Sequence, residues 1–167
     1  MTCNRWVIAT LLLVGGGAAV AAAEPLAIKA VMKPKEQIRL DFPTPDKHFL
    51  LMVRREGTLS GAGAFDGAQA VEYGVHDLIP GVGGNPRGYY VVTAKDGAQA
   101  IIEWSVQATF IPDPDGKPML LDNGVWKFVG GTGSLAGIQG AGTMHIKAVS
   151  PADREFSFDG QYVLPKR

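Results

Sequence analysis

The sequence has a single cysteine, Cys3, and that residue belongs to a segment that predicts a secretory leader. Residues 1–5 form a short cationic start, residues 6–20 are apolar, and three alanines precede Glu24, which are the three parts of a signal peptide. The apolar run is shorter than the ~20 residues that a membrane-spanning helix needs. Removal of the leader, residues 1–23, takes Cys3 with it. We therefore expect a secreted or periplasmic chain whose one domain, residues 24–167, is stabilised by its core and not by disulfides.

The sequence also lacks an excess of charge of either sign. It has 16 basic and 16 acidic residues, and the leader contains only one of them, Arg5. A protein that binds phosphate backbones or anionic lipid needs a surplus of Lys and Arg. No apolar run after the leader is long enough to span a membrane, and no repeat of 20–50 residues is present. These absences argue against nucleic acid or membrane as a partner.

The residues after the leader alternate between apolar and polar, which is typical of β-strands. Turn-forming groups such as Pro43-Thr-Pro45-Asp46 and Asp96-Gly97 interrupt the alternation at intervals too short for crossover helices. The pattern predicts an all-β fold, a single antiparallel up-and-down barrel of about eight strands whose last strand pairs with the first long one. An open sandwich is the alternative. The expected strands are residues 26–32 (the weakest), 36–42, 48–64, 69–79, 87–95, 99–111, 125–130, 138–149 and 154–164.

The glycine-rich stretch of residues 126–143 permits two interpretations. Gly131-x-Gly133-x-x-Ala136 after an apolar run is similar to a dinucleotide-binding turn. That turn needs a helix starting near Ser134, and three glycines within its first three turns would each cost roughly 1 kcal/mol relative to alanine. We therefore expect a β-hairpin in which glycine serves backbone angles and bulges.

This stretch, Trp126-x-Phe-x-Gly-Gly-Thr-Gly-x-Leu-Ala-Gly-Ile-x-Gly-x-Gly-Thr143, resembles the signature of the allene oxide cyclase-like barrel proteins and, more loosely, of the dirigent proteins. The resemblance implies a small calycin-type antiparallel barrel. It also implies a cofactor-independent isomerase or cyclase activity and association of barrels through their outer faces. The motif contains none of the reactive residues of these families, so it assigns no catalytic residue.

The strand pattern predicts an apolar, aromatic barrel interior. Even-numbered positions from Ala100 to Phe110 are apolar, whereas Glu103, Ser105 and Gln107 lie on the other face. An eight-stranded barrel is either filled by its own side chains or wide enough for one small ligand, and both remain open here. The aromatic residues that we expect to contact a ligand are Tyr73, Tyr90, Trp104, Phe110, Phe158 and Tyr162.

Two charged residues are expected on this inner face, Arg55 and Asp77. Arg55 shares its parity with Val53, and Asp77 shares its parity with Tyr73. A three-residue loop would place Gly57 opposite Asp77, with Arg55 diagonal to it and within reach. The two residues are candidates for a catalytic or orienting pair, or for a buried ion pair with a structural role. A bulge at Gly74 would reverse the parity, sending Asp77 to solvent and His76 inward.

No pattern points to a cofactor or a metal. The three histidines lack cysteine partners and His-x-His spacing, and no serine lies in a Gly-x-Ser-x-Gly elbow. Three functions remain: a barrel that binds a small apolar or aromatic molecule, a cofactor-independent isomerase or cyclase, and a filled barrel that serves as a structural or self-associating protein. Whether the protein is an enzyme stays open at this point.

Overall fold

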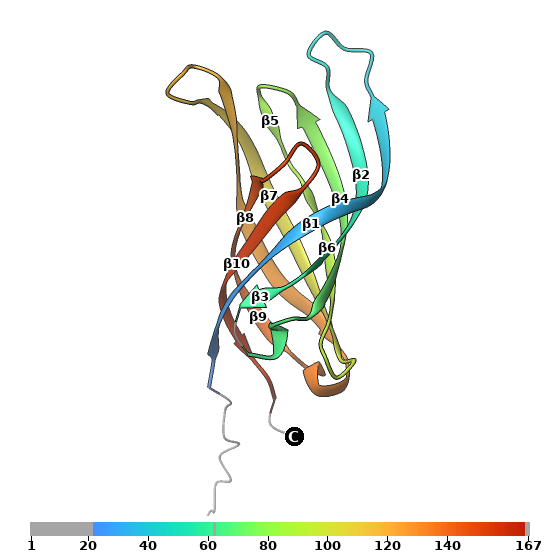
Figure 1. The fold of residues 1–167 in the computed structure, drawn as a ribbon, viewed down its shortest axis with the longest axis vertical. Helices are drawn as coiled ribbons and strands as arrows, with labels where there is room; N and C mark the ends of the chain where they lie inside the picture. The colour runs from blue at the N-terminus through green and yellow to red at the C-terminus, as the bar shows by residue number, and fades with distance from the viewer. Residues whose placement is uncertain (1–21, 62, 166–167) are drawn as a thin grey trace, which may run out of the picture.

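The computed structural model describes residues 22–61 and 63–165, and these form an all-β barrel (Figure 1). Within these ranges, the barrel has eight main strands and four short elements. The short elements are the strands β3 (Ser60–Gly61) and β5 (Gly83–Gly84) and the 3-10 helices η1 (Gly63–Phe65) and η2 (Gly133–Leu135). No helix in the described ranges is long and apolar enough to cross a membrane. The predicted leader lies almost wholly outside these ranges. The eight main strands are β1 (Glu24–Asp41), β2 (Phe49–Thr58), β4 (Gln69–Ile79), β6 (Arg87–Thr93), β7 (Gln99–Pro112), β8 (Pro118–Gly131), β9 (Gln139–Ala148) and β10 (Arg154–Val163).

The sheet closes on itself, as the sequence predicts. Each main strand pairs antiparallel with the next along the chain, and β10 pairs with β1 from Glu24 opposite Tyr162 to Met32 opposite Arg154. The open-sandwich alternative is therefore wrong. Closure pairs the strand edges that an open meander would expose.

Several strand predictions need correction. The predicted strand 48–64 divides into β2, β3 and η1. Segments 26–32 and 36–42 are one continuous strand, β1, because the break at Pro34 is only a bulge between Pro34 and Glu36. Segment 125–130 begins earlier, at Pro118, because β8 pairs with β7 along its whole length.

The lower end of the barrel in Figure 1 is sealed by η1 and η2. Each turn buries one apolar side chain, Phe65 or Leu135, to 1% exposure. Gly133 has φ 56°, in the left-handed region where a β-branched residue is strained. The glycine-rich stretch is thus a strand connection, and the interpretation as a dinucleotide-binding turn is wrong.

The barrel interior next to this end is filled by aromatic side chains. Trp104, Trp126, Tyr90, Phe156 and Phe158 are each at most 2% exposed, and most of their contacts are edge-to-face. The even-numbered face of β7 points inward, as predicted. The lower half of the barrel is a packed core.

The upper end is open and uneven. Strand β1 continues past its last pair with β10 at Met32, and β8 continues beyond its last pair with β9 at Asp122. The β9–β10 turn, red in Figure 1, therefore ends well below the β1–β2 and β7–β8 hairpin loops. We call the resulting gap in the wall, between β1 and β8 above the β9–β10 turn, the notch.

Candidate functional site

The face of β4 that points into the barrel is the opposite of the one that the sequence pattern predicts. Glu72 is fully buried and His76 is 7% exposed, whereas Tyr73 is 50% exposed on the outside. The reason is the register, in which Arg55 lies directly opposite Glu72 and Gly57 opposite Ala70. The predicted pairing of Gly57 with Asp77 is therefore wrong.

The register reverses the parity of the whole of β4 without a bulge at Gly74. The ladder between β2 and β4 is continuous from Thr58 opposite Gln69 to Phe49 opposite Leu78. Below it, Leu59 and Ala68 continue the pairing, and η1 takes up the residues between them. Odd positions of β2 thus face even positions of β4.

Asp77 and Tyr73, two of the predicted inward residues, therefore lie outside the barrel. The Asp77 side chain is 46% exposed, and its Oδ1 lies 2.5 Å from Nε2 of His48, which stacks on Phe42. Pairing with His48 replaces the predicted pairing with Arg55.

Arg55 does point inward, as predicted, and its partners are Glu72 and His76. Its Nη1 donates to Glu72 Oε2 at 2.8 Å and lies 3.3 Å from His76 Nε2. A guanidinium can only donate, so in this contact Nε2 is the acceptor. His76 Nε2 is also 3.5 Å from Glu72 Oε1, too far for a good hydrogen bond.

Gly74 is what allows Glu72 and His76 to meet. The two residues are four apart on one face of β4, and their side chains bend toward each other over Gly74. A Cβ at Gly74 would lie 2.5 Å from Glu72 Oε1 and 2.8 Å from His76 Nε2. Because Gly74 has no Cβ, these two polar atoms can occupy the space that a side chain would fill.

Tyr90 and Trp104 lie next to this cluster and carry polar atoms that also lack partners. Tyr90 pairs with Glu72 across β4 and β6, and the Trp104 ring centroid is 6.0 Å from that of His76. Burial, together with the charge of Glu72, raises the pKa of Tyr90 well above its ordinary value, so its hydroxyl stays a neutral donor. In the described part of the chain, five buried polar atoms have no hydrogen-bond partner: Arg55 Nε, Glu72 Oε1, Tyr90 Oη, Trp104 Nε1 and Asp122 Oδ1.

Asp122 and Arg154 mark the level of the notch. Asp122 is 8% exposed, and burial raises its pKa to about 6 although Arg154 attracts its charge. Burial and repulsion from Arg55 lower the pKa of Arg154. Its Nη1 donates to the β9–β10 turn carbonyls of Ser150, Pro151 and Asp153. Arg55 and Arg154 thus line one pocket, and Asp122 lies near enough to attract the charge of Arg154.

A pocket of about 440 Å³ leads through the notch to Arg55. Its walls come from the bulged part of β1, from β2 and from the β9–β10 turn. Higher up, inward-facing Phe110 and Leu120 are half-buried and pair with each other across β7 and β8. Within the pocket itself, Pro34, Leu51 and Pro151 supply apolar surface, and Arg55 and Arg154 supply charge. The pocket is lined by Pro34, Lys35, Glu36, Gln37, Leu51, Arg55, Pro151, Ala152 and Arg154.

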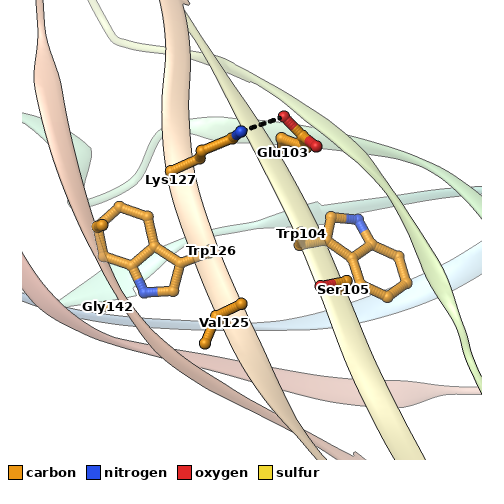
Figure 2. Close-up of a pocket in the computed structure, with 8 residues that line it drawn as sticks. Glu103, Trp104, Ser105, Val125, Trp126, Lys127 and Gly142 are labelled. Carbon is orange, nitrogen blue, oxygen red and sulfur yellow. Dashed lines mark ion pairs between the residues drawn. The ribbon is translucent and has the colours of Figure 1, made fainter.

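Another hollow, of about 360 Å³, lies on the outer wall over β7, β8 and β9 (Figure 2). Lys127 Nζ and Glu103 Oε2 pair across it at 3.0 Å, and Val125 is 58% exposed in it. The indoles of Trp104 and Trp126 are buried in the core. The two charged side chains of this hollow pair with each other on the outer face, so we place the candidate site at the notch and the cluster beneath it.

The other predicted aromatic residues lie partly in the packed core and partly at the upper end of the barrel. Phe158 is 1% and Tyr162 6% exposed in the packed lower half, where the Tyr162 hydroxyl donates to Glu24 at 2.7 Å. Of the six predicted aromatic residues, Phe110 lies at the open end and Tyr90 and Trp104 border the polar cluster. Within residues 22–61 and 63–165, no three His, Cys, Asp or Glu side chains are grouped as a metal site requires.

The overall shape is similar to that of known barrels. No family model and no curated protein matches the sequence. A solved pterocarpan synthase dirigent protein aligns over 99% of this chain and 100% of its own, with a TM-score of 0.54 at 12% identity. The protein has a dirigent-like barrel fold.

Two further solved structures agree with this fold. A second pterocarpan synthase dirigent protein aligns with a TM-score of 0.52 at 13% identity, over 89% of this chain and 99% of its own. A protein of unknown function from Clostridium acetobutylicum ATCC 824 aligns with a TM-score of 0.55 at 12% identity, over 86% and 97%. At such identities, the likeness concerns the fold of this dirigent-like barrel.

Sequence reasoning missed Glu72, Asp122 and Arg154, and it placed His76 inward only in the alternative with a bulge at Gly74. The available signal was Glu72-x-Gly74-x-His76, in which a small central residue lets two polar side chains converge on one strand face. For Asp122 and Arg154 the sequence has no comparable signal, because the start of β8 does not alternate and the end of the β9–β10 turn is defined only by the fold.

Proposed function

We propose that the protein binds a small apolar or aromatic molecule at the open end of the barrel. The observation that carries the proposal is the set of five unpartnered buried polar atoms beneath apolar walls. Buried polar groups are normally hydrogen-bonded, so unpaired ones beneath an opening are suited to the polar group of a ligand or to water. Because the lower half is packed, the ligand would occupy the upper half, against residues such as Phe110 and Leu120.

Binding can be tested with N-phenyl-1-naphthylamine, an uncharged probe that fluoresces in apolar sites. We expect saturable binding to the wild type. Leu120→Trp, which fills the mouth, should weaken it at least about tenfold, or about 1.4 kcal/mol. Leu121→Trp is the matched control, because Leu121 is 37% exposed on the outer face of the same strand. The proposal would be contradicted if the wild type did not increase the fluorescence of the probe, or if both variants lost affinity for the probe equally.

A second candidate is a cofactor-independent isomerase or cyclase, favoured by the position of Glu72 Oε1. This oxygen is buried and unpartnered, lies over Gly74, and belongs to a carboxyl group suited to move a proton. A molecule that copurifies with the protein should then exchange hydrogen for deuterium in D₂O. Mass spectrometry should detect the exchange with wild type and not with Glu72→Gln. Binding without exchange would contradict the isomerase or cyclase and leave ligand binding as the only proposed function.

The compartment and self-association also belong to this proposal. We expect secretion or export to the periplasm, with the mature chain starting at Glu24, which N-terminal sequencing of exported protein would test. Ile38 and Met52 are adjacent on the outer face and are 60% and 48% exposed, which supports association between copies. Met52→Lys should then lower the mass that light scattering measures.

A further inference from the structure

The notch pocket is lined by two arginines from different strands, Arg55 of β2 and Arg154 of β10. Their guanidiniums are close enough for repulsion to affect the titration of Arg154. Glu72 already balances the charge of Arg55, so the remaining repulsion falls on Arg154, and an anion beside Arg154 would relieve it. The arrangement therefore has an electrostatic reason to take up negative charge.

Both arginines retain binding capacity. Arg55 is bound to Glu72 through Nη1, while its buried Nε has no partner. Arg154 bonds to backbone carbonyls of the turn through Nη1, and in the described part of the chain it forms no ion pair within 4.0 Å. The turn fixes the position of Arg154 through backbone carbonyls, while Asp153 of the turn and Asp122 attract its charge from beyond ion-pair distance.

The other charged groups at the pocket are already engaged. Glu36 pairs with Arg54 at 3.4 Å, and Lys35 lies 3.9 Å from Glu56. Deeper in the barrel, Glu72 neutralises Arg55, and Asp122 is attracted to Arg154. These four cations and four anions balance, and Arg154 is the cation whose attracting carboxyl group lies beyond ion-pair distance, so the pocket suits an anion of one charge better than a phosphate dianion.

We infer that the notch pocket is a carboxylate site, in which Arg55 and Arg154 bind the carboxylate of an otherwise apolar ligand. A planar carboxylate matches the fork of N–H groups on a guanidinium. Pro34, Leu51 and Pro151 supply apolar walls beside the two charges. This inference rests on the proposed function, because the apolar body of the ligand would lie in the open end.

The test uses 2-naphthoate and 2-naphthamide, which differ in charge and hardly in size, measured by isothermal titration calorimetry on the full mature protein. Wild type should bind the naphthoate about tenfold more tightly or better. Arg154→Gln should abolish this preference and leave the affinity for naphthamide unchanged, and Arg154→Lys should keep part of it. Arg87→Gln is the control, because it removes the same charge from an exposed position outside the barrel.

Because Arg55 is buried, it is replaced together with its partner, as Arg55→Gln with Glu72→Gln, and this variant should also lose the preference. Equal binding of naphthoate and naphthamide by wild type would overturn the carboxylate site and leave the proposed function intact. A preference that survives in both the Arg154→Gln and the double variant would overturn it as well. If neither naphthalene compound nor the uncharged probe binds, the proposed function fails together with the inference.

Discussion

The two ends of the barrel are built from the same strands but closed in different ways. At the lower end, η1 and η2 each insert one apolar side chain, and Phe65 and Leu135 are 1% exposed. At the upper end, Arg55, Glu72 and Asp122 are nearly as buried, yet several of their polar atoms have no partner. The difference indicates that the lower end supplies stability and the upper end supplies the site.

The strongest test of this comparison removes a buried side chain that closes the lower end. Phe65→Ala should lower the free energy of unfolding by about 3–5 kcal/mol, because it leaves a cavity among Phe128 and Tyr162. Phe110→Ala at the open end should cost less than half as much, since Phe110 is only half-buried. Urea denaturation measures both. Equal losses would mean that the open end is packed as tightly as the sealed one.

The polar cluster should be sensitive to losing one partner and tolerant of losing both. Glu72→Leu leaves Arg55 as an uncompensated buried cation and should cost about 3–5 kcal/mol. The double variant Arg55→Met with Glu72→Leu should recover most of this stability. Asp77→Ala, outside the barrel, should change little. A double variant no more stable than Glu72→Leu would show that the cluster is held by more than this ion pair.

Asp122 makes the open end sensitive to pH. Its pKa in the folded protein is about 6, against 3.8 for a free carboxyl group. The contribution of Asp122 to the free energy of unfolding is therefore fully present below about pH 4. It is lost as the pH rises through about 6, and the loss is about 3 kcal/mol at most. Asp122→Asn should remove this loss, so the variant should be the more stable protein at pH 8 and equal to wild type at pH 4. Thermal unfolding across this range provides the measurement, and Asp159→Asn on the exposed face of β10 controls for net charge.

The smallest expected effect concerns the backbone of the sealed end. Gly133→Val should cost about 1–3 kcal/mol, because φ is 56° there and the residue approaches Ala98 closely. Gly116, which has φ 77° in the β7–β8 loop and open space around it, is the matched position at the other end. Gly116→Val should show the backbone strain without the clash. A larger loss at Gly116, measured by denaturation, would contradict this account.

The barrel was predictable from the sequence, and most of the site was not. On β7 the alternation is clean, because every even position from Ala100 to Phe110 is apolar. On β4 the apolar residues Val71, Tyr73 and Val75 face outward, and two polar residues, Glu72 and His76, face inward. Periodicity assigns the more apolar face to the core, so it fails where a strand carries a buried polar site.

Pairing of β10 with β1 joins residues 138 positions apart, as in the hydrogen bond between Tyr162 and Glu24. A chain emerging from the ribosome can form every hairpin from β1 to β9 and still have two free edges until β10 is complete. Such long-range closure is slow, and the open intermediate exposes edges that invite intermolecular pairing. The step that completes the barrel is thus also the one at which a newly made chain depends most on being kept apart from its neighbours.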